Sequence, residues 1–249
     1  VVGEALTNHP LVNAISFIGS TRTGKRIFAN CAQSIKRITL ELGGKSPTLL
    51  LEDANLENAI PKVLSIAFSN SGQACHAGSR LLVPQQKLVE VERLLVEHIA
   101  KLTIGDPASL ETQIGPMITQ KQFDTVQAYI QSGLDEGARL VCGGLGRVEG
   151  FDTGYFVKPT VFVCENESLK IVQEEIFGPV LSVLSYHDEK EALKMANNTL
   201  FGLSAYIFSA DEEKALRYAK QIRSGRVLIN TASSQAKNPP FGGMKQSGM

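Results

Sequence analysis

At 249 residues the chain is long enough for one large or two modest domains, and a chain of this size buries roughly three quarters of its unfolded surface. Lysine and arginine (25) balance aspartate and glutamate (25), so the overall charge favours neither a nucleic-acid partner nor a membrane surface. No apolar run approaches the roughly 20 residues that span a bilayer. We therefore expect a small-molecule partner, no nucleic acid and no membrane.

Hydrophobic periodicity and turn residues predict strands that alternate with helices. Residues 14–18 read as a short buried strand, and the turn at 19–21 supplies a capping hydroxyl for a helix over about 23–34. The helix expected over 53–70 carries an apolar stripe on both sides of Pro61, which predicts a kink or a displaced first turn. The remaining predictions are a strand at 80–84, helices at 86–101 and 119–136 (the second with a capping box of Thr119 and Gln122), strands at 139–141, 155–163, 180–186, 204–208 and 226–230, and capped helices starting at Asp188 and Ser209. This alternation is typical of a layered α/β domain with a largely parallel sheet.

The four cysteines point to a reducing compartment. Cys31, Cys75, Cys142 and Cys164 form no C-x-x-C pair and no His/Cys spacing suited to zinc, and four in a chain of this length do not make a disulfide scaffold. We expect a cytoplasmic protein with no metal site.

One cysteine lies in a setting that suits chemistry. Residues 69–80 place Cys75 among small, turn-forming residues, after an amphipathic helix and before an apolar strand. Small neighbours let a substrate and backbone N–H groups approach the sulfur, which a thiolate nucleophile needs. The alternative is a buried structural cysteine, since free cysteine is among the most buried residue types.

Several segments, in order along the whole chain, resemble the aldehyde dehydrogenase family of NAD(P)-dependent enzymes with a cysteine nucleophile. The matching segments are 17–21 (Phe-Ile-Gly-Ser-Thr), 41–47 (Glu-Leu-Gly-Gly-Lys-Ser-Pro), 72–75 (Gly-Gln-Ala-Cys), 158–160 (Lys-Pro-Thr), 174–179 (Glu-Glu-Ile-Phe-Gly-Pro) and 240–248 (Pro-Phe-Gly-Gly-Met-Lys-Gln-Ser-Gly). The resemblance implies a three-layer α/β catalytic domain at 42–249, with the nucleophile loop at 69–80, and a remnant of the coenzyme-binding domain at 1–41.

The resemblance also implies roles for particular residues. Cys75 would attack an aldehyde, and Glu41 would be the general base that activates water for hydrolysis of the thioester. NAD or NADP would be held by Gly19 and Ser20 near its pyrophosphate, by Leu42, and by Glu175 and Phe177 near the nicotinamide ribose. The family's second oxyanion donor, an upstream Asn, has no counterpart here. The resemblance implies a homo-oligomer for a full-length protein and no redox turnover by these 249 residues alone.

The sequence alone leaves other interpretations of these residues open. Cys75 could serve a cysteine-dependent acyltransferase or esterase without nicotinamide, Glu41 could be a strand-end charge facing solvent, and Gly19-Ser20 could be an ordinary capped turn. A catalytically silent protein of the same fold is disfavoured because both Cys75 and Glu41 are present. His76 is a poor base for its neighbour Cys75, because adjacent side chains do not face each other, and is expected to border the pocket.

Overall fold

A parallel sheet forms the centre of the molecule. The computed structural model describes residues 1–233 and 239–249, and within them seven strands form one sheet in the order β10-β9-β3-β4-β7-β6-β5. Every neighbouring pair in it is parallel except β5 and β6. The strands are β3 (Pro47–Leu50), β4 (Arg80–Pro84), β5 (Arg139–Cys142), β6 (Thr160–Val163), β7 (Val180–Tyr186), β9 (Ser204–Phe208) and β10 (Arg226–Ile229).

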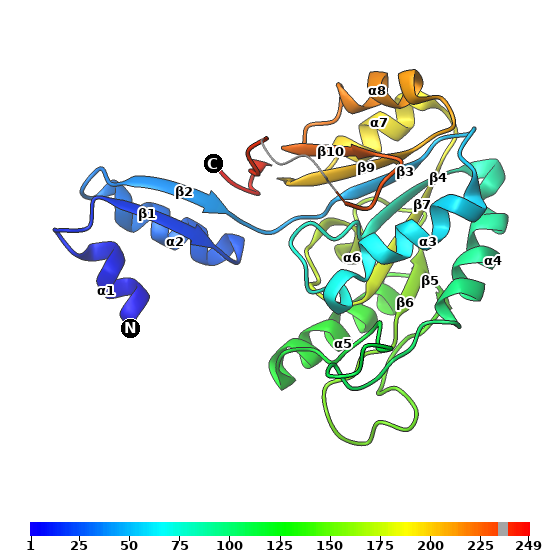
Figure 1. Cartoon of the computed structure of the whole chain (residues 1–249), viewed down its shortest axis with the longest axis horizontal. Helices are drawn as coiled ribbons and strands as arrows, with labels where there is room; N and C mark the ends of the chain where they lie inside the picture. Colours follow the sequence, from blue (N-terminus) through cyan, green and yellow to red (C-terminus); the bar gives the residue numbers. More distant parts are fainter. Residues whose placement is uncertain (234–238) are drawn as a thin grey trace.

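Helices cover both faces of this sheet, so the expected three-layer α/β architecture is confirmed (Figure 1). Alternate strand residues enter two separate cores: Leu49 and Leu82 face one, and Leu50 and Leu81 face the other. Burial on both faces is the reason why the inner strands are mostly apolar. One face is covered by α3 (Leu56–Ala67) and α4 (Leu88–Ile99), and the other by α5 (Gln120–Asp135), α6 (Lys170–Gln173), α7 (Glu189–Asn197) and α8 (Glu212–Ala219).

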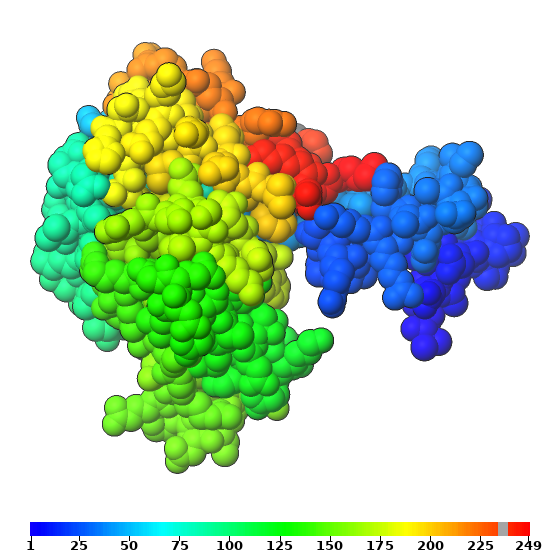
Figure 2. All heavy atoms as spheres, turned by 180° about the vertical axis from the view of Figure 1, so that it is seen from behind, coloured from blue at the N-terminus to red at the C-terminus, as the bar shows by residue number. Residues whose placement is uncertain are grey.

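The first 41 residues form a separate arm beside the sheet (Figure 1). It contains α1 (Val2–Asn8), β1 (Ala14–Ile18), α2 (Thr21–Ala32) and β2 (Arg37–Glu41), with β1 and β2 paired in parallel. The last residues of the chain attach to β2, since Leu40 and Met249 exchange backbone hydrogen bonds of 3.0 and 3.1 Å. Seen from behind, this terminal segment lies between the arm and the main body (Figure 2).

Four sequence predictions need correction. The strand expected at 14–18 forms as β1 but is not buried, because it belongs to a two-stranded sheet and each of its residues stays at least partly exposed. The helix expected over 53–70 is shorter, because Asn55 provides the cap by accepting a bond from the Asn58 N–H at 3.1 Å; Pro61 lies within the helix. The strand expected over 155–163 begins only at Thr160, after Pro159, which has no N–H to donate to a ladder. Ser209 does not cap α8: its hydroxyl donates to the Asp53 carboxylate, and Asp211 is the cap.

Sequence analysis also missed elements that carry little periodic signal. The helix α1 and the four-residue strand β3 were not predicted, although β3 lies between β9 and β4 in the sheet and is wholly buried. The capping box at Thr119 and the cap at Asp188 are confirmed. A short antiparallel pair, β8 (Phe201–Gly202) with β11 (Met244–Lys245), secures the end of the chain.

Candidate active site

A cavity of about 560 Å³ lies at the amino-terminal ends of the sheet strands, between the arm and the main body. The segment after β2 leads into β3, the nucleophile loop leads into β4, and the segment at 174–179 leads into β7. These three strands are neighbours in the sheet, so three segments far apart in sequence meet at the same ends of these strands. The cavity is lined by Ile18, Gly19, Ser20, Glu41, Gly43, Gln73, Ala74, Cys75, His76, Gln122, Glu175 and Phe177.

The nucleophile loop is shaped by an unusual backbone. A 3₁₀ turn (Ser69–Gly72) follows α3, and Asn70, Ser71 and Gly72 all have positive φ angles, of 49°, 58° and 75°. Position 72 requires glycine, because a Cβ there would lie 2.2 Å from the Gly178 carbonyl oxygen. The Ser71 hydroxyl accepts a bond from the Gly115 N–H at 2.9 Å. The chain is thereby turned back, and Cys75 faces the cavity.

Cys75 is half-buried and free, and its surroundings disfavour the thiolate. Burial raises the pKa of the thiol, and the negative charges of Glu175 and Glu41 raise it further, whereas the backbone N–H groups of Cys75 and His76 lower it. At neutral pH the sulfur is therefore mostly protonated, and a base or a bound cationic group is needed to generate the nucleophile.

Glu41 is the last residue of β2 and reaches the same cavity. Its Oε2 atom is buried without a hydrogen-bond partner among the described residues, and burial raises the pKa of the carboxyl group. A raised carboxyl pKa suits a group that takes and returns protons near neutral pH. The alternative of a solvated strand-end charge does not fit this placement.

The Glu175 carboxylate packs directly on the Gly43-Gly44 turn. Its Oε1 accepts a bond from the Gly44 N–H at 3.2 Å, and a Cβ on Gly43 would lie 2.0 Å from its Oε2. Burial raises the pKa of Glu175, while the Gly44 N–H and the charge of Lys45 lower it. Gly43 is thus needed for the close approach of this carboxylate, whereas Gly44 is needed because a Cβ there would lie 2.4 Å from the Cys75 carbonyl oxygen.

Phe177 presents its ring at the cavity in a constrained backbone conformation. Its φ angle is 57° and its exposed fraction is 39%. Gln122, on the first turn of α5, donates through Nε2 to the carbonyl oxygens of Ile176 (3.0 Å) and Phe177 (2.9 Å). Sequence analysis gave Gln122 only a capping role, because nothing local indicates that its amide reaches residues more than fifty positions away.

Gly19 and Ser20 bring the start of α2 to the cavity. The Ser20 hydroxyl caps this twelve-residue helix by accepting a bond from the Thr23 N–H at 3.3 Å. The remaining N–H groups of the first turn and the helix dipole make such a terminus favourable for an anion. Leu42, in contrast, does not line the cavity. Its side chain is buried against α2, where a Cβ on Gly24 would lie 2.5 Å from it.

Two buried cations lie beneath the site. Arg80 is fully buried and donates to the carbonyl oxygens of Lys45 (3.1 Å), Met195 (3.0 Å) and Ala196 (3.0 Å). The Lys45 amine is buried with no hydrogen-bond partner among the described residues. Burial lowers the pKa of Lys45 to about 7, and the charge of Arg80 lowers it too. Neither residue was singled out from the sequence.

His76 lies at the border of the cavity, as expected. Burial lowers the pKa of its imidazole, and so does the charge of Arg226. No hydrogen bond between His76 and Cys75 is present in the described part of the chain.

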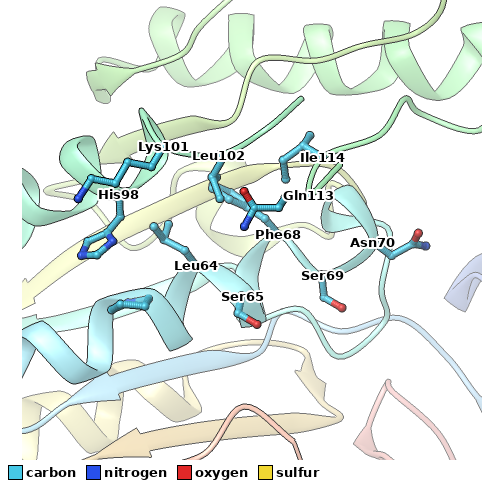
Figure 3. Close-up of a pocket in the computed structure, with 11 residues that line it drawn as sticks. Leu64, Ser65, Phe68, Ser69, Asn70, His98, Lys101, Leu102, Gln113 and Ile114 are labelled. Atoms are coloured by element: carbon cyan, nitrogen blue, oxygen red, sulfur yellow. The ribbon is translucent and has the colours of Figure 1, made fainter. Parts of the chain in front are cut away.

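Elsewhere in the described residues, no cavity is lined by a comparable group of a thiol and carboxylates. A second cavity of about 460 Å³ lies between the carboxyl-terminal ends of α3 and α4, with Leu64, Phe68 and His98 among its lining residues (Figure 3). Residues 1–233 and 239–249 contain no cluster of three or more His, Cys, Asp or Glu residues able to hold a metal ion. In the same residues no helix is long and apolar enough to cross a membrane.

The fold and the cavity define an α/β protein that presents one thiol and two carboxylates beside a helix amino terminus. A sequence model described as the aldehyde dehydrogenase family matches residues 1–249. The chain therefore belongs to the aldehyde dehydrogenase family, which confirms the resemblance found in its sequence.

Individual relatives agree with this assignment. The chain is 46% identical over 247 residues to 3-succinoylsemialdehyde-pyridine dehydrogenase of a Pseudomonas species, covering 99% of the chain and 52% of the relative. Aldehyde dehydrogenase C of Pseudomonas syringae, a mutant solved with NAD⁺ and octanal, is 44% identical with a TM-score of 0.97, covering 100% of the chain and 51% of that structure. A Mycobacterium tuberculosis aldehyde dehydrogenase solved with NAD⁺ is 40% identical with a TM-score of 0.95, covering 99% and 51%. The chain spans about half the length of the curated relatives it matches.

Proposed function

We propose that the protein oxidises an aldehyde to a carboxylic acid with NAD or NADP, through a thioester on Cys75. The observation that carries the proposal is the cavity itself. Cys75 and Glu41 line it together with Gly19, Ser20, Glu175 and Phe177, although these residues come from four separate segments of the chain.

The residues present fit the nicotinamide half of the coenzyme. The Glu175 carboxylate, fixed on the Gly44 N–H, would accept bonds from the ribose hydroxyls, and the exposed Phe177 ring would pack on the same sugar. The capped start of α2 at Ser20 would lie beside the pyrophosphate. When bound, the nicotinamide ring accepts the hydride given up by the substrate carbon. Leu42, buried against α2, would contribute only through its backbone.

Each protein group then has a defined task. The Cys75 thiol loses its proton to solvent, its thiolate sulfur adds to the carbonyl carbon as the carbon–oxygen double bond opens, and the resulting oxyanion takes hydrogen bonds from backbone N–H groups of the loop. Loss of hydride from that carbon leaves a thioester. Glu41 takes a proton from a water molecule as the water attacks the thioester, and the carbon–sulfur bond breaks to release the acid and the thiol.

Relatives support both the substrate class and the coenzyme. The Pseudomonas syringae structure contains NAD⁺ and octanal, and the Mycobacterium tuberculosis structure contains NAD⁺. The name of the Pseudomonas relative also indicates an aldehyde substrate. These matches favour NAD and an aldehyde for the whole protein.

We propose that residues 1–41 belong to a coenzyme-binding domain and residues 42–249 form the catalytic domain. Support comes from the separate two-stranded sheet of the arm. We also propose that the whole protein is a cytoplasmic homo-oligomer. Four free cysteines favour a reducing compartment, and exposed apolar side chains of the arm, such as Leu11, Phe28 and Ile35, favour a covering partner surface.

The test is coenzyme reduction by the natural full-length protein, with NAD and NADP, across a panel of aldehydes. We expect reduced nicotinamide and carboxylic acid in equal amounts. Hydrolysis of an activated ester without any coenzyme reduction would instead indicate the cysteine-dependent acyltransferase or esterase.

A further inference from the structure

An arginine whose charge acts on His76, the residue next to Cys75, is not used by the proposed mechanism. Arg226 is the first residue of β10, and its guanidinium carbon lies 4.9 Å from the centroid of the Phe241 ring. A guanidinium over an aromatic face is held in place by electrostatic attraction. The side chain is partly exposed, so its charge is ordered and also reachable.

Two contacts made by neighbours of this cation reach the catalytic groups. Tyr206 donates its hydroxyl to the His76 carbonyl oxygen at 3.0 Å. Burial lowers the pKa of the His76 imidazole and the charge of Arg226 lowers it further, whereas burial raises the pKa of the Tyr206 hydroxyl and Arg226 offsets only part of that rise. On the other side, Gly242 follows Phe241 and lies so close to Glu41 that a Cβ on it would be 3.5 Å from Oε1. Arg226 does not itself line the cavity. It lies beside Tyr206, which bonds to His76, and beside the Phe241-Gly242 segment, which approaches Glu41, so its charge lies behind the residues that line the cavity.

Arg226 has no negative partner among the described residues. It forms no ion pair with any Asp or Glu there, and its Nε is buried without a hydrogen-bond partner. An uncompensated, partly desolvated guanidinium is unfavourable unless an anion reaches it. A carboxylate is the group that it binds best, through two parallel N–H···O bonds.

We propose that Arg226 determines substrate specificity by binding an anionic group carried by the aldehyde, remote from the carbonyl that Cys75 attacks. The substrate class is thus an aldehyde that also bears a carboxylate or a similar anion. This inference rests on the proposed function, in which Cys75 attacks that carbonyl.

A test independent of aldehyde and coenzyme uses two alkylating agents of similar size on the natural protein without coenzyme. In each, the Cys75 sulfur forms a bond to the methylene carbon and iodide leaves; iodoacetate is anionic and iodoacetamide is neutral. The measured quantity is the ratio of the two alkylation rates at Cys75, obtained by peptide mapping. Arg226→Gln should lower this ratio roughly fivefold, which is the effect of one charge pair at short range in water-like surroundings.

Two variants and one internal reference complete the experiment. Arg226→Lys keeps the charge and should keep most of the ratio. Arg223→Gln removes an exposed arginine three residues earlier and should leave the ratio unchanged. The ratio at Cys142, in β5, should be the same in all proteins. An unchanged ratio at Cys75 in Arg226→Gln, or an equal loss in Arg223→Gln, would overturn the proposal.

Enzyme kinetics distinguish the proposal for Arg226 from the proposed aldehyde oxidation. In the active full-length enzyme, Arg226→Gln should raise KM for a four-carbon aldehyde acid by roughly tenfold while leaving KM for butanal unchanged. Equal effects on both aldehydes overturn the role of Arg226 but not aldehyde oxidation. If neither aldehyde reduces the coenzyme in the wild-type protein, the proposed function fails, and the alkylation ratio still decides whether Arg226 attracts anions to Cys75.

Discussion

Gly44 donates its backbone N–H to the Glu175 carboxylate at 3.2 Å, across 131 positions of sequence. The neighbouring Gly43 leaves no room for a side chain, since a Cβ there would lie 2.0 Å from Glu175 Oε2. We predict that Gly43→Ala displaces this carboxylate and weakens coenzyme binding by about tenfold or more, because hydrogen bonds to charged groups contribute about 1.5–3 kcal/mol. Titration of the full-length protein with reduced coenzyme, followed by fluorescence, measures the change. The matched control is Gly3→Ala, on α1, where no atom lies within 4 Å of the new methyl group; similar affinities for the two variants would contradict the prediction.

Cys75 should be the residue whose loss stops the reaction. We predict that Cys75→Ala abolishes coenzyme reduction, because no other cysteine lines the cavity, and that it leaves coenzyme binding intact. In the unmodified protein, iodoacetamide should label Cys75 before Cys142 and well before the buried Cys31 and Cys164. Turnover by the alanine variant, or preferential labelling of Cys142, would remove Cys75 from the mechanism.

Glu41 should act after the thioester has formed. We predict that Glu41→Gln retains a rapid burst of reduced coenzyme, equal to one per active site, and slows the following steady state by about 10²–10⁴-fold, the usual contribution of a general base. Rapid-mixing measurements separate the two phases. A steady state at the wild-type rate would show that another group activates the water, provided that thioester hydrolysis limits the rate.

The alkylation rate of Cys75 should depend on pH in a way that reports Glu175. Burial is the main cause that raises the pKa of this thiol above its ordinary value of 9.0, and the Glu175 charge is the next. The rate should therefore keep rising beyond that pH, and Glu175→Gln should move the midpoint to lower pH. Iodoacetamide kinetics over a pH series give both midpoints. A midpoint that moves upward in Glu175→Gln would show that the carboxylate does not act on the sulfur through its charge.

Lys45 should make the stability of the protein depend on pH above neutrality. Its pKa is about 7 in the folded protein against an ordinary value of 10.5, so between these values the unfolded chain binds a proton that the folded protein lacks. The free energy of unfolding should therefore rise with pH across this window, by up to about 1.4 kcal/mol per pH unit, and this stabilisation is lost as pH falls through it. Lys45→Met should reduce that slope in denaturant unfolding at several pH values. Equal slopes in the two proteins would mean that Lys45 stays protonated when folded.

Local sequence signals predicted the elements but not all of their limits. The Thr119 and Asp188 caps were predictable because a capping side chain bonds to an N–H only three residues away. Ser209 has the same signature, yet its hydroxyl bonds to Asp53, a contact between positions 156 apart that no local pattern contains. The short strand β3 has four residues, too few for a clear period, and its position is fixed by neighbours on both sides.

The same distinction applies to the candidate site. Cys75 and Glu41 were found from their motifs, and both line the cavity. Gln122, which lines the cavity, was missed because its amide reaches residues 54 and 55 positions away. Arg226, which we propose as a specificity residue, was missed because it meets Phe241 only through tertiary packing. Leu42 was expected near the coenzyme, but its side chain packs on α2, since strand alternation turns it away from Glu41.

The strand order β3-β4-β7 also determines how three segments of the site are arranged side by side. The Glu41 segment, the Cys75 loop and the Glu175 segment each precede one of these strands, and adjacent strands lie roughly 4.8 Å apart. The order of these three segments along the strand ends therefore follows the order of the strands, which backbone pairing fixes, such as Pro47 with Arg80 and Arg80 with Ser182. Changes to the side chains of the outer helices leave that order unaltered. A slip of one residue in β4, in contrast, would turn Arg80 to the opposite face and move the Cys75 loop along the strand direction by about 3.3 Å relative to the other two segments.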